Sequence, residues 1–219
     1  MKKILYVILL VALLPMLSGC HKEYEFKLDK KPTTGYENGY KWVDLGLSVK
    51  WASYNVGASI PEEYGDYIAW GDIYEKDNYS ADNSETYGKN ISKLKLTQDA
   101  AYKRWGGNWR MPTKSEISEL VNNCTWSWTK QNGVYGYTVK GVSGNSIFLP
   151  AAGYKTGNSC YDRGTTGIFW TSKGYDTEDD GHVWASTLSF DLEDDDDGLS
   201  DRWGYRRYFG ASIRPVLGA

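Results

Sequence analysis

The apolar segments of this chain are short, and between residues 40 and 217 they are separated by turns rich in glycine, asparagine and aspartate. Short β-branched and aromatic runs bounded by such turn residues are typical of β-strands. We therefore predict strands over residues 42–46, 49–54, 67–70, 135–140, 146–149, 168–172, 183–190 and 211–216. Residues 75–96 are polar and are predicted to form a long loop.

Two segments carry helical signals. A short helix is predicted over residues 98–103 with Thr97 as its N-cap. A second helix is predicted to follow Thr113, which has the capping-box spacing to Glu116. Its apolar face consists of Ile117, Leu120 and Val121. Because strands and helices do not alternate and no solenoid repeat is present, we predict an α+β fold of short, twisted antiparallel strands, two helices and long loops.

Two arginines are expected to be architectural. Arg110 and Arg214 each lie in a segment that contains tryptophan, proline or other aromatic residues. Arginine stacks on aromatic rings and forms forked hydrogen bonds with carboxylates. We predict that these side chains pair with Asp44 or Asp66.

The first twenty residues have the pattern of an export signal. Lys2 and Lys3 precede an eleven-residue apolar run over residues 4–14, and Leu-Ser-Gly precedes Cys20. This segment resembles the signals of bacterial lipoproteins, which implies cleavage before Cys20 and acylation of its sulfur. A transmembrane helix is one alternative, although eleven residues span only about half of a bilayer core of ~30 Å. An ordinary cysteine is the other alternative.

The domain organisation follows from this signal. We predict a signal peptide over residues 1–19, an acylated cysteine with a flexible polar tether over 20–39, and one folded domain over 40–219. Several acyl chains attach a protein stably to a membrane, so the membrane is a predicted partner.

Charge and cysteine content limit the other partners. Loss of Lys2 and Lys3 takes the formal net charge from −3 to −5, because residues 1–20 contain no acid. No basic patch is present, so nucleic acid is not an expected partner. Cys124 and Cys160 could form a disulfide outside the cytoplasm, or both could remain free thiols.

Five segments in order resemble one family. They are VDLGLSVKWA at 43–52, YGDYIAWG at 64–71, WGGNWRMPT at 105–113, GNSIFLPAAGY at 144–154 and SIRPV at 212–216. Together they resemble the Fibrobacter succinogenes major paralogous domain, which is common in surface and secreted proteins of Bacteroidetes. The resemblance covers about residues 40–217. It implies a fold similar to C-type lectins and to the formylglycine-generating enzyme, with long loops that present a ligand face. The family brings no general activity.

The histidine content argues against common enzyme classes. His21 and His182 are the only histidines, so a catalytic triad would have to use His182 and no zinc set of His and Cys exists. The oxygen-activating cysteine pair of the formylglycine-generating enzyme has no counterpart in Cys124 and Cys160. We predict that the protein is not an enzyme. A glycoside hydrolase with paired carboxylates is an alternative, because the chain has 28 acidic residues.

Two acidic runs, at residues 176–180 and 191–198, are the best candidates for a metal site, and Asp201 follows the second run. Calcium takes six to eight oxygen ligands, several of them carboxylates. We name Asp194, Asp195 and Asp197 as candidate calcium ligands. An EF-hand register fails, because its twelfth position would be Gly204. The alternative is a solvated acidic loop without metal.

Aromatic residues gather in the C-terminal third among glycine, asparagine and aspartate. Sugars stack on such rings while polar side chains bind their hydroxyl groups. The candidate ligand-binding residues are Tyr154, Trp170, Tyr175, Trp184, Trp203 and Tyr205. The alternative for any one of them is a place in the core, because large aromatic residues are mostly buried.

These observations together predict a lipoprotein of the cell envelope, anchored in the outer membrane. Its folded domain is predicted to recognise a glycan or a surface polymer without catalysis. The alternative is a structural or adhesion component that binds other surface proteins.

Overall fold

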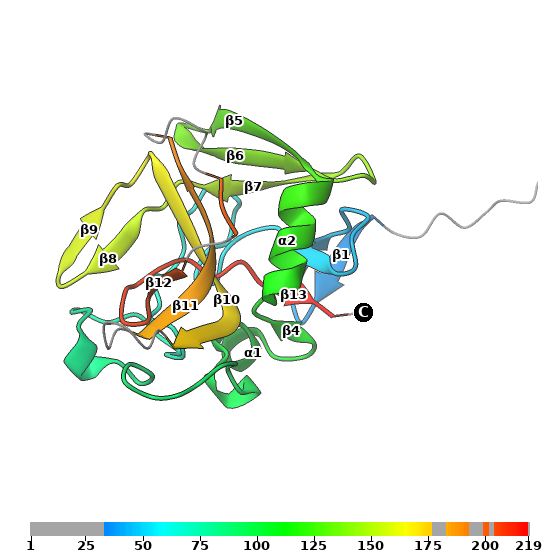
Figure 1. Ribbon diagram of the computed structural model, residues 1–219. Helices are drawn as coiled ribbons and strands as arrows, with labels where there is room; N and C mark the ends of the chain where they lie inside the picture. The colour runs from blue at the N-terminus through cyan, green and yellow to red at the C-terminus, as the bar shows by residue number, and fades with distance from the viewer. Residues whose placement is uncertain (1–32, 177–182, 193–198, 202–203, 219) are drawn as a thin grey trace, which may run out of the picture. The chain divides into compact units, whose positions relative to one another are not determined.

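The computed structural model describes residues 33–176, 183–192, 199–201 and 204–218. Residues 32–219 form one compact unit, and everything below concerns that unit. Within the described residues, the regular structure consists of two α-helices, two short 3₁₀ helices and four antiparallel sheets, which confirms the α+β class (Figure 1). The signal segment and Cys20 lie outside the described residues.

A five-stranded sheet joins the two ends of the unit. Its order is β1 (Thr34–Glu37), β2 (Tyr40–Val43), β3 (Lys50–Ala52), β13 (Val216–Leu217) and β4 (Trp109–Arg110). The last strand thus pairs with both β3 and β4, which are far apart in the sequence. Strand β1 lies in the segment that we predicted to be tether, so the folded part begins before residue 40.

A second sheet consists of β5 (Thr125–Gln131), β6 (Val134–Lys140) and β7 (Ser146–Pro150). The predicted strands over 135–140 and 146–149 are confirmed, whereas β5 was not predicted. Asn132 and Gly133 connect β5 to β6, with φ values of 49° and 89°. Two consecutive residues with positive φ form a type I′ turn, whose twist matches that of paired strands.

The third sheet is formed by β10 (Thr166–Asp176), β11 (Val183–Asp191) and β12 (Gly204–Arg206). The predicted strands over 168–172 and 183–190 are therefore confirmed. A separate hairpin of β8 (Tyr154–Thr156) and β9 (Ser159–Tyr161) projects beside this sheet (Figure 1). Two other predicted strands are wrong. Residues 67–70 form only a single bridge, from Ile68 to Ala211, and the predicted strand over 211–216 shortens to β13.

The sequence predicted the start of one helix correctly and misplaced the start of the other. Helix α2 (Lys114–Asn123) begins at the predicted capping box, in which Thr113 N–H donates to Glu116 Oε2 at 2.8 Å. Helix α1 (Ala100–Trp105) begins two residues later than predicted. Asp99 is its N-cap, because Oδ1 accepts from Tyr102 N–H at 3.0 Å while Oδ2 accepts from Met111 N–H at 2.8 Å. Residues 96–98 form a separate 3₁₀ turn.

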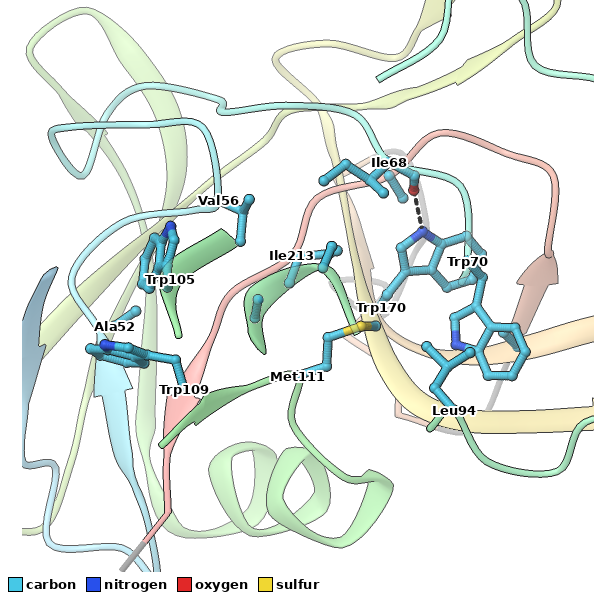
Figure 2. Close-up of a cluster of buried hydrophobic side chains, with 14 of the residues drawn as sticks. Ala52, Val56, Ile68, Trp70, Leu94, Trp105, Trp109, Met111, Trp170 and Ile213 are labelled. Atoms are coloured by element: carbon cyan, nitrogen blue, oxygen red, sulfur yellow. Dashed lines mark hydrogen bonds between the residues drawn. The ribbon is translucent and has the colours of Figure 1, made fainter. Parts of the chain in front are cut away.

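The main core is built around tryptophans from distant segments (Figure 2). Trp70 and Trp170 lie on one side of Met111 and Ile213, and Trp105 and Trp109 lie on the other. Trp170 Nε1–H donates to the Ile68 carbonyl at 2.8 Å, and Trp70 Nε1–H donates to the Thr171 carbonyl at 2.8 Å. These bonds satisfy the indole N–H groups, whose burial would otherwise carry a desolvation cost.

Arg214 fastens the C-terminal segment to the core. Its guanidinium is fully buried and donates to Asn55 Oδ1 at 2.8 Å, to the carbonyls of Ala52 and Ser53, and to the Phe148 carbonyl at 2.9 Å. The architectural role is as predicted, but the predicted acidic partner is wrong. The backbone carbonyls of Ala52, Ser53 and Phe148 accept hydrogen bonds from Arg214 in place of an acidic side chain.

Arg110 also has a partner other than the two predicted aspartates. It forms a forked ion pair with Glu116, with distances of 2.8 and 2.5 Å. Asp66 pairs with Arg104 instead, and Asp44 accepts from the Gly46 N–H at 2.8 Å. The capping box brings Glu116 next to Arg110, which explains why Arg110 pairs with Glu116 rather than with Asp44 or Asp66.

The two described cysteines are free thiols rather than a disulfide. Cys124 follows α2 and packs partly buried against the second core cluster, which includes Leu120 and Trp51. Cys160 is exposed on β9. The proposed disulfide is therefore not formed in this structure.

Candidate ligand-binding surface

Four aromatic side chains from three segments meet on one side of the folded unit. We call Tyr154, Tyr161, Tyr205 and Phe209 the aromatic surface. The ring of Tyr154 stacks on Tyr161 with centroids 5.7 Å apart and on Phe209 with centroids 5.3 Å apart. Tyr205 lies 6.0 Å from Tyr154 and 6.3 Å from Phe209.

The β8–β9 hairpin sets the position of two of these rings. Tyr154 and Tyr161 are cross-strand partners at the open end of the hairpin. Gly153 precedes them with φ of 68°, and a Cβ atom there would lie 1.9 Å from the Tyr161 carbonyl oxygen. Only glycine permits this approach of the two backbones. At the other end, Gly157 has φ of 56° in the two-residue turn.

Backbone pairing brings the other two rings to the hairpin. Lys155 N–H donates to the Gly210 carbonyl at 2.8 Å, and Gly210 N–H donates back to the Lys155 carbonyl at 2.9 Å. Phe209 and Tyr205 are therefore held beside Tyr154 by main-chain hydrogen bonds. A site held by such bonds is ordered before a ligand arrives, which lowers the entropic cost of binding.

The base of the aromatic surface belongs to the core, while its edge reaches solvent. Tyr154, Tyr205 and Phe209 are partly buried and pack against the main core cluster. Tyr161 is 44% exposed. Burial raises the pKa of Tyr154, and the charges of Asp162, Tyr161 and Asp191 add to that effect. The Tyr154 hydroxyl is therefore neutral at physiological pH and can donate a hydrogen bond.

Two more rings extend the aromatic surface. Tyr208 makes an edge contact with Phe209 at 5.1 Å, and Tyr87 makes one with Tyr208 at 5.1 Å. Tyr87 comes from the long polar loop of residues 75–96. The rings thus form a continuous strip from the hairpin to that loop.

The structure brings together only some of the predicted ligand-binding residues. Tyr154 and Tyr205 lie in the aromatic surface. Trp170 is fully buried in the core, so its predicted role at a ligand face is wrong. Its position on β10 points it inward, where its indole N–H binds Ile68. Trp203 lies outside the described residues.

Tyr175 and Trp184 are partly buried cross-strand partners on β10 and β11. The ammonium groups of Lys114 and Lys173 lie 5.2 and 5.7 Å from the Tyr175 ring. No ring contact joins this pair to the aromatic surface in the described part of the chain. The candidate ligand-binding residues did not include Tyr87, Tyr161, Tyr208 and Phe209. The Gly157-Asn158 turn was the available signal for the hairpin that pairs Tyr154 with Tyr161.

The candidate calcium ligands Asp194, Asp195 and Asp197 lie outside the described residues. Among the residues that are described, no three His, Cys, Asp or Glu side chains gather as a metal site would require. Two hollows of about 470 Å³ are lined by residues 71–98 rather than by the aromatic surface.

Comparison of the chain with family models, with curated proteins and with solved structures found no match. No helix in the described ranges is both long and apolar enough to span a membrane.

Proposed function

We propose that this protein is a lipid-anchored component of the bacterial cell envelope whose folded domain binds a glycan or a surface polymer without catalysis. The observation that carries the proposal is the aromatic surface, in which Tyr154, Tyr161, Tyr205 and Phe209 lie within 6.3 Å of a neighbouring ring. Flat rings with hydroxyl groups at their edges suit the C–H faces and hydroxyl groups of sugars.

The family assignment is part of the same proposal. The five sequence segments support membership of the Fibrobacter succinogenes major paralogous domain and a fold like that of C-type lectins. The α+β class and the return of the last strand to the sheet of the first strands agree with such a fold. A hairpin and loops that carry the aromatic surface also agree with it.

The first test is a glycan array probed with the full-length protein in detergent, once with calcium and once with a chelator. We expect selective binding to one group of glycans. Loss of that binding in chelator would support calcium binding by the acidic run that contains Asp194, Asp195 and Asp197. Absence of binding in both conditions would contradict the glycan proposal.

Membrane attachment through Cys20 is tested separately. We expect the wild-type protein to incorporate a labelled fatty acid and to enter the detergent phase when a detergent solution is warmed until it separates. The Cys20→Ser variant should incorporate no label and stay in the aqueous phase. Equal labelling of both proteins would contradict the anchor.

Binding to other surface proteins is the second candidate, and strand β5 is the observation that favours it. Within the described residues, this seven-residue strand pairs with β6 alone, so one of its edges has no partner strand there. The backbone groups of Trp126, Trp128 and Lys130 face away from β6, because the residues that flank the turn form a hydrogen-bonded pair. An open strand edge can accept a strand from a partner protein.

A further inference from the structure

A third hollow lies between two sheets, on elements that the aromatic surface does not use. Its volume is about 270 Å³. Strands β1 and β2 form one wall, β5, β6 and β7 form another, and the segment after β3 completes it. The polar residues that line it include Thr34, Lys41, Ser53, Gln131, Asn145 and Ser146.

Four polar side chains on this hollow have no partner inside the described chain. The hydroxyl groups of Thr34, Ser53 and Ser146 form no hydrogen bond there, and the Lys41 ammonium forms no ion pair. Ser53 is only 7% exposed. The Ser53 hydroxyl oxygen stays accessible although most of the residue is buried, so it can bind a ligand or a water molecule. Lys41 is partly buried, which removes part of its hydration.

Two amide side chains on the same hollow are already fixed. Gln131 Nε2 donates to Glu62 Oε1 at 2.6 Å, and Asn145 Nδ2 donates to the Asp44 carbonyl at 2.8 Å. Each of these bonds uses one N–H of the amide, and both amide oxygens remain available as acceptors. Glu62 itself is not among the residues that line the hollow.

The remaining lining consists of Thr138, whose hydroxyl is hydrogen-bonded to Thr129, and of the apolar residues Val43, Pro61, Ile147 and Phe148. The hollow thus combines an ammonium group, hydroxyl groups, amide oxygens and a small apolar wall. An ammonium group favours a carboxylate, hydroxyl and amide groups bind ligand hydroxyls, and the apolar wall accepts C–H groups. A volume slightly below the ~300 Å³ typical of the smallest ligand pockets suits a single sugar ring.

We infer that this hollow binds one sugar ring that carries a carboxylate, such as a uronic acid unit. Lys41 pairs with the carboxylate, and Ser53 with its neighbours Thr34 and Ser146 binds ring hydroxyls. The site shares no residue with the aromatic surface. It therefore does not depend on the proposed function of that surface, and the two can fail separately.

The test is isothermal titration of the full-length protein in detergent with digalacturonate, neutral galactobiose and inorganic phosphate. We expect digalacturonate to bind at least about tenfold more tightly than galactobiose, as the loss of a charged hydrogen bond predicts. Phosphate that binds as tightly as digalacturonate would overturn the assignment to a sugar. Failure of digalacturonate to bind would overturn the site.

Variants locate the binding. Lys41→Met keeps the aliphatic stem and should weaken digalacturonate binding at least about tenfold, whereas Lys41→Arg should retain it within about threefold. Lys103→Met removes the same charge from an exposed position on α1 and should bind like the wild type. Tyr161→Ala should also bind digalacturonate as tightly as the wild type, because Tyr161 does not line the hollow. Unchanged binding by folded Lys41→Met would overturn the inference.

Discussion

Single buried side chains hold distant segments of this molecule together. Arg207 is buried, and its guanidinium lies 4.4 Å from the Trp70 ring. It donates to the carbonyls of Lys89 at 2.8 Å and Ile91 at 2.7 Å. The polar loop of residues 75–96 is thereby fixed to the core although it contains little regular structure. Arg214 does the same for the C-terminal segment.

The two described cysteines should differ in reactivity. Burial raises the pKa of Cys124 to about 11, and the charge of Glu119 adds to the effect, whereas Cys160 is exposed. Because the thiolate is the reactive form, we expect iodoacetamide at pH 8 to modify Cys160 at least about tenfold faster than Cys124. Peptide mass spectrometry measures both rates. Protection of both thiols until a reductant is added would instead reveal a disulfide.

Glu116 should make the stability of the fold depend on pH. Burial alone would raise its pKa, but hydrogen bonds from Arg110 and Thr113 outweigh burial and hold the pKa below 4.5. A carboxyl group with a lowered pKa stabilises the folded state above its unfolded pKa, and this contribution disappears as the pH falls through the folded pKa.

We therefore expect the wild type to exceed Glu116→Gln by about 1–3 kcal/mol in unfolding free energy at pH 7. The difference should shrink at a second, acidic pH below the lowered folded pKa, where the carboxyl group takes up a proton. Urea unfolding of both proteins at the two pH values measures it. A difference that stays constant with pH would show that the ion pair with Arg110 contributes little.

At the scale of elements, the β8–β9 hairpin decides whether the aromatic surface forms. Gly153→Ala would place a methyl group against the Tyr161 carbonyl at a positive φ. We expect a loss of about 3 kcal/mol or more in unfolding free energy. Gly157 also has positive φ but has free space around it, so Gly157→Ala should cost only about 1–2 kcal/mol. Urea unfolding compares the two, and equal losses would contradict the close approach at Gly153.

The elements that sequence predicted correctly are those with strong local signals. The capping box of Thr113 and Glu116 marks the start of α2, and β-branched and aromatic runs bounded by turn residues mark β6, β7, β10 and β11. The start of α1 was misplaced because Asp99 is tied to Met111, a contact made only in the folded chain. Strand β1 was missed because its residues are polar and it pairs at the edge of a sheet.

At the scale of the whole molecule, long-range pairing was beyond the reach of sequence patterns. Ile68 to Trp70 is a short apolar run and Ala211 to Arg214 alternates between apolar and polar residues, as in strands, yet both segments make isolated bridges. The same limit applies to the candidate site. Trp170 and Tyr154 are both aromatic residues near glycine, and only the fold shows that the first is buried and the second lies at the surface.

The sheet that closes the molecule and the aromatic surface depend on the same C-terminal segment. Residues 204–210 carry Tyr205 and Phe209, and the chain then continues to β13 between β3 and β4. Arg214 anchors the stretch that joins them. The binding surface is thus supported by the part of the fold that unites the two ends of the folded unit, which favours a rigid, preformed site.

Titration of the best glycan from the array against wild type, Tyr161→Ala and Tyr36→Ala tests the central claim most directly. Tyr161 is 44% exposed within the aromatic surface, whereas Tyr36 is 69% exposed on β1. We expect Tyr161→Ala to weaken binding by about tenfold, consistent with ~1–3 kcal/mol for stacking on an aromatic ring. Tyr36→Ala should bind like the wild type. Equal affinities for all three proteins would contradict glycan binding at the aromatic surface.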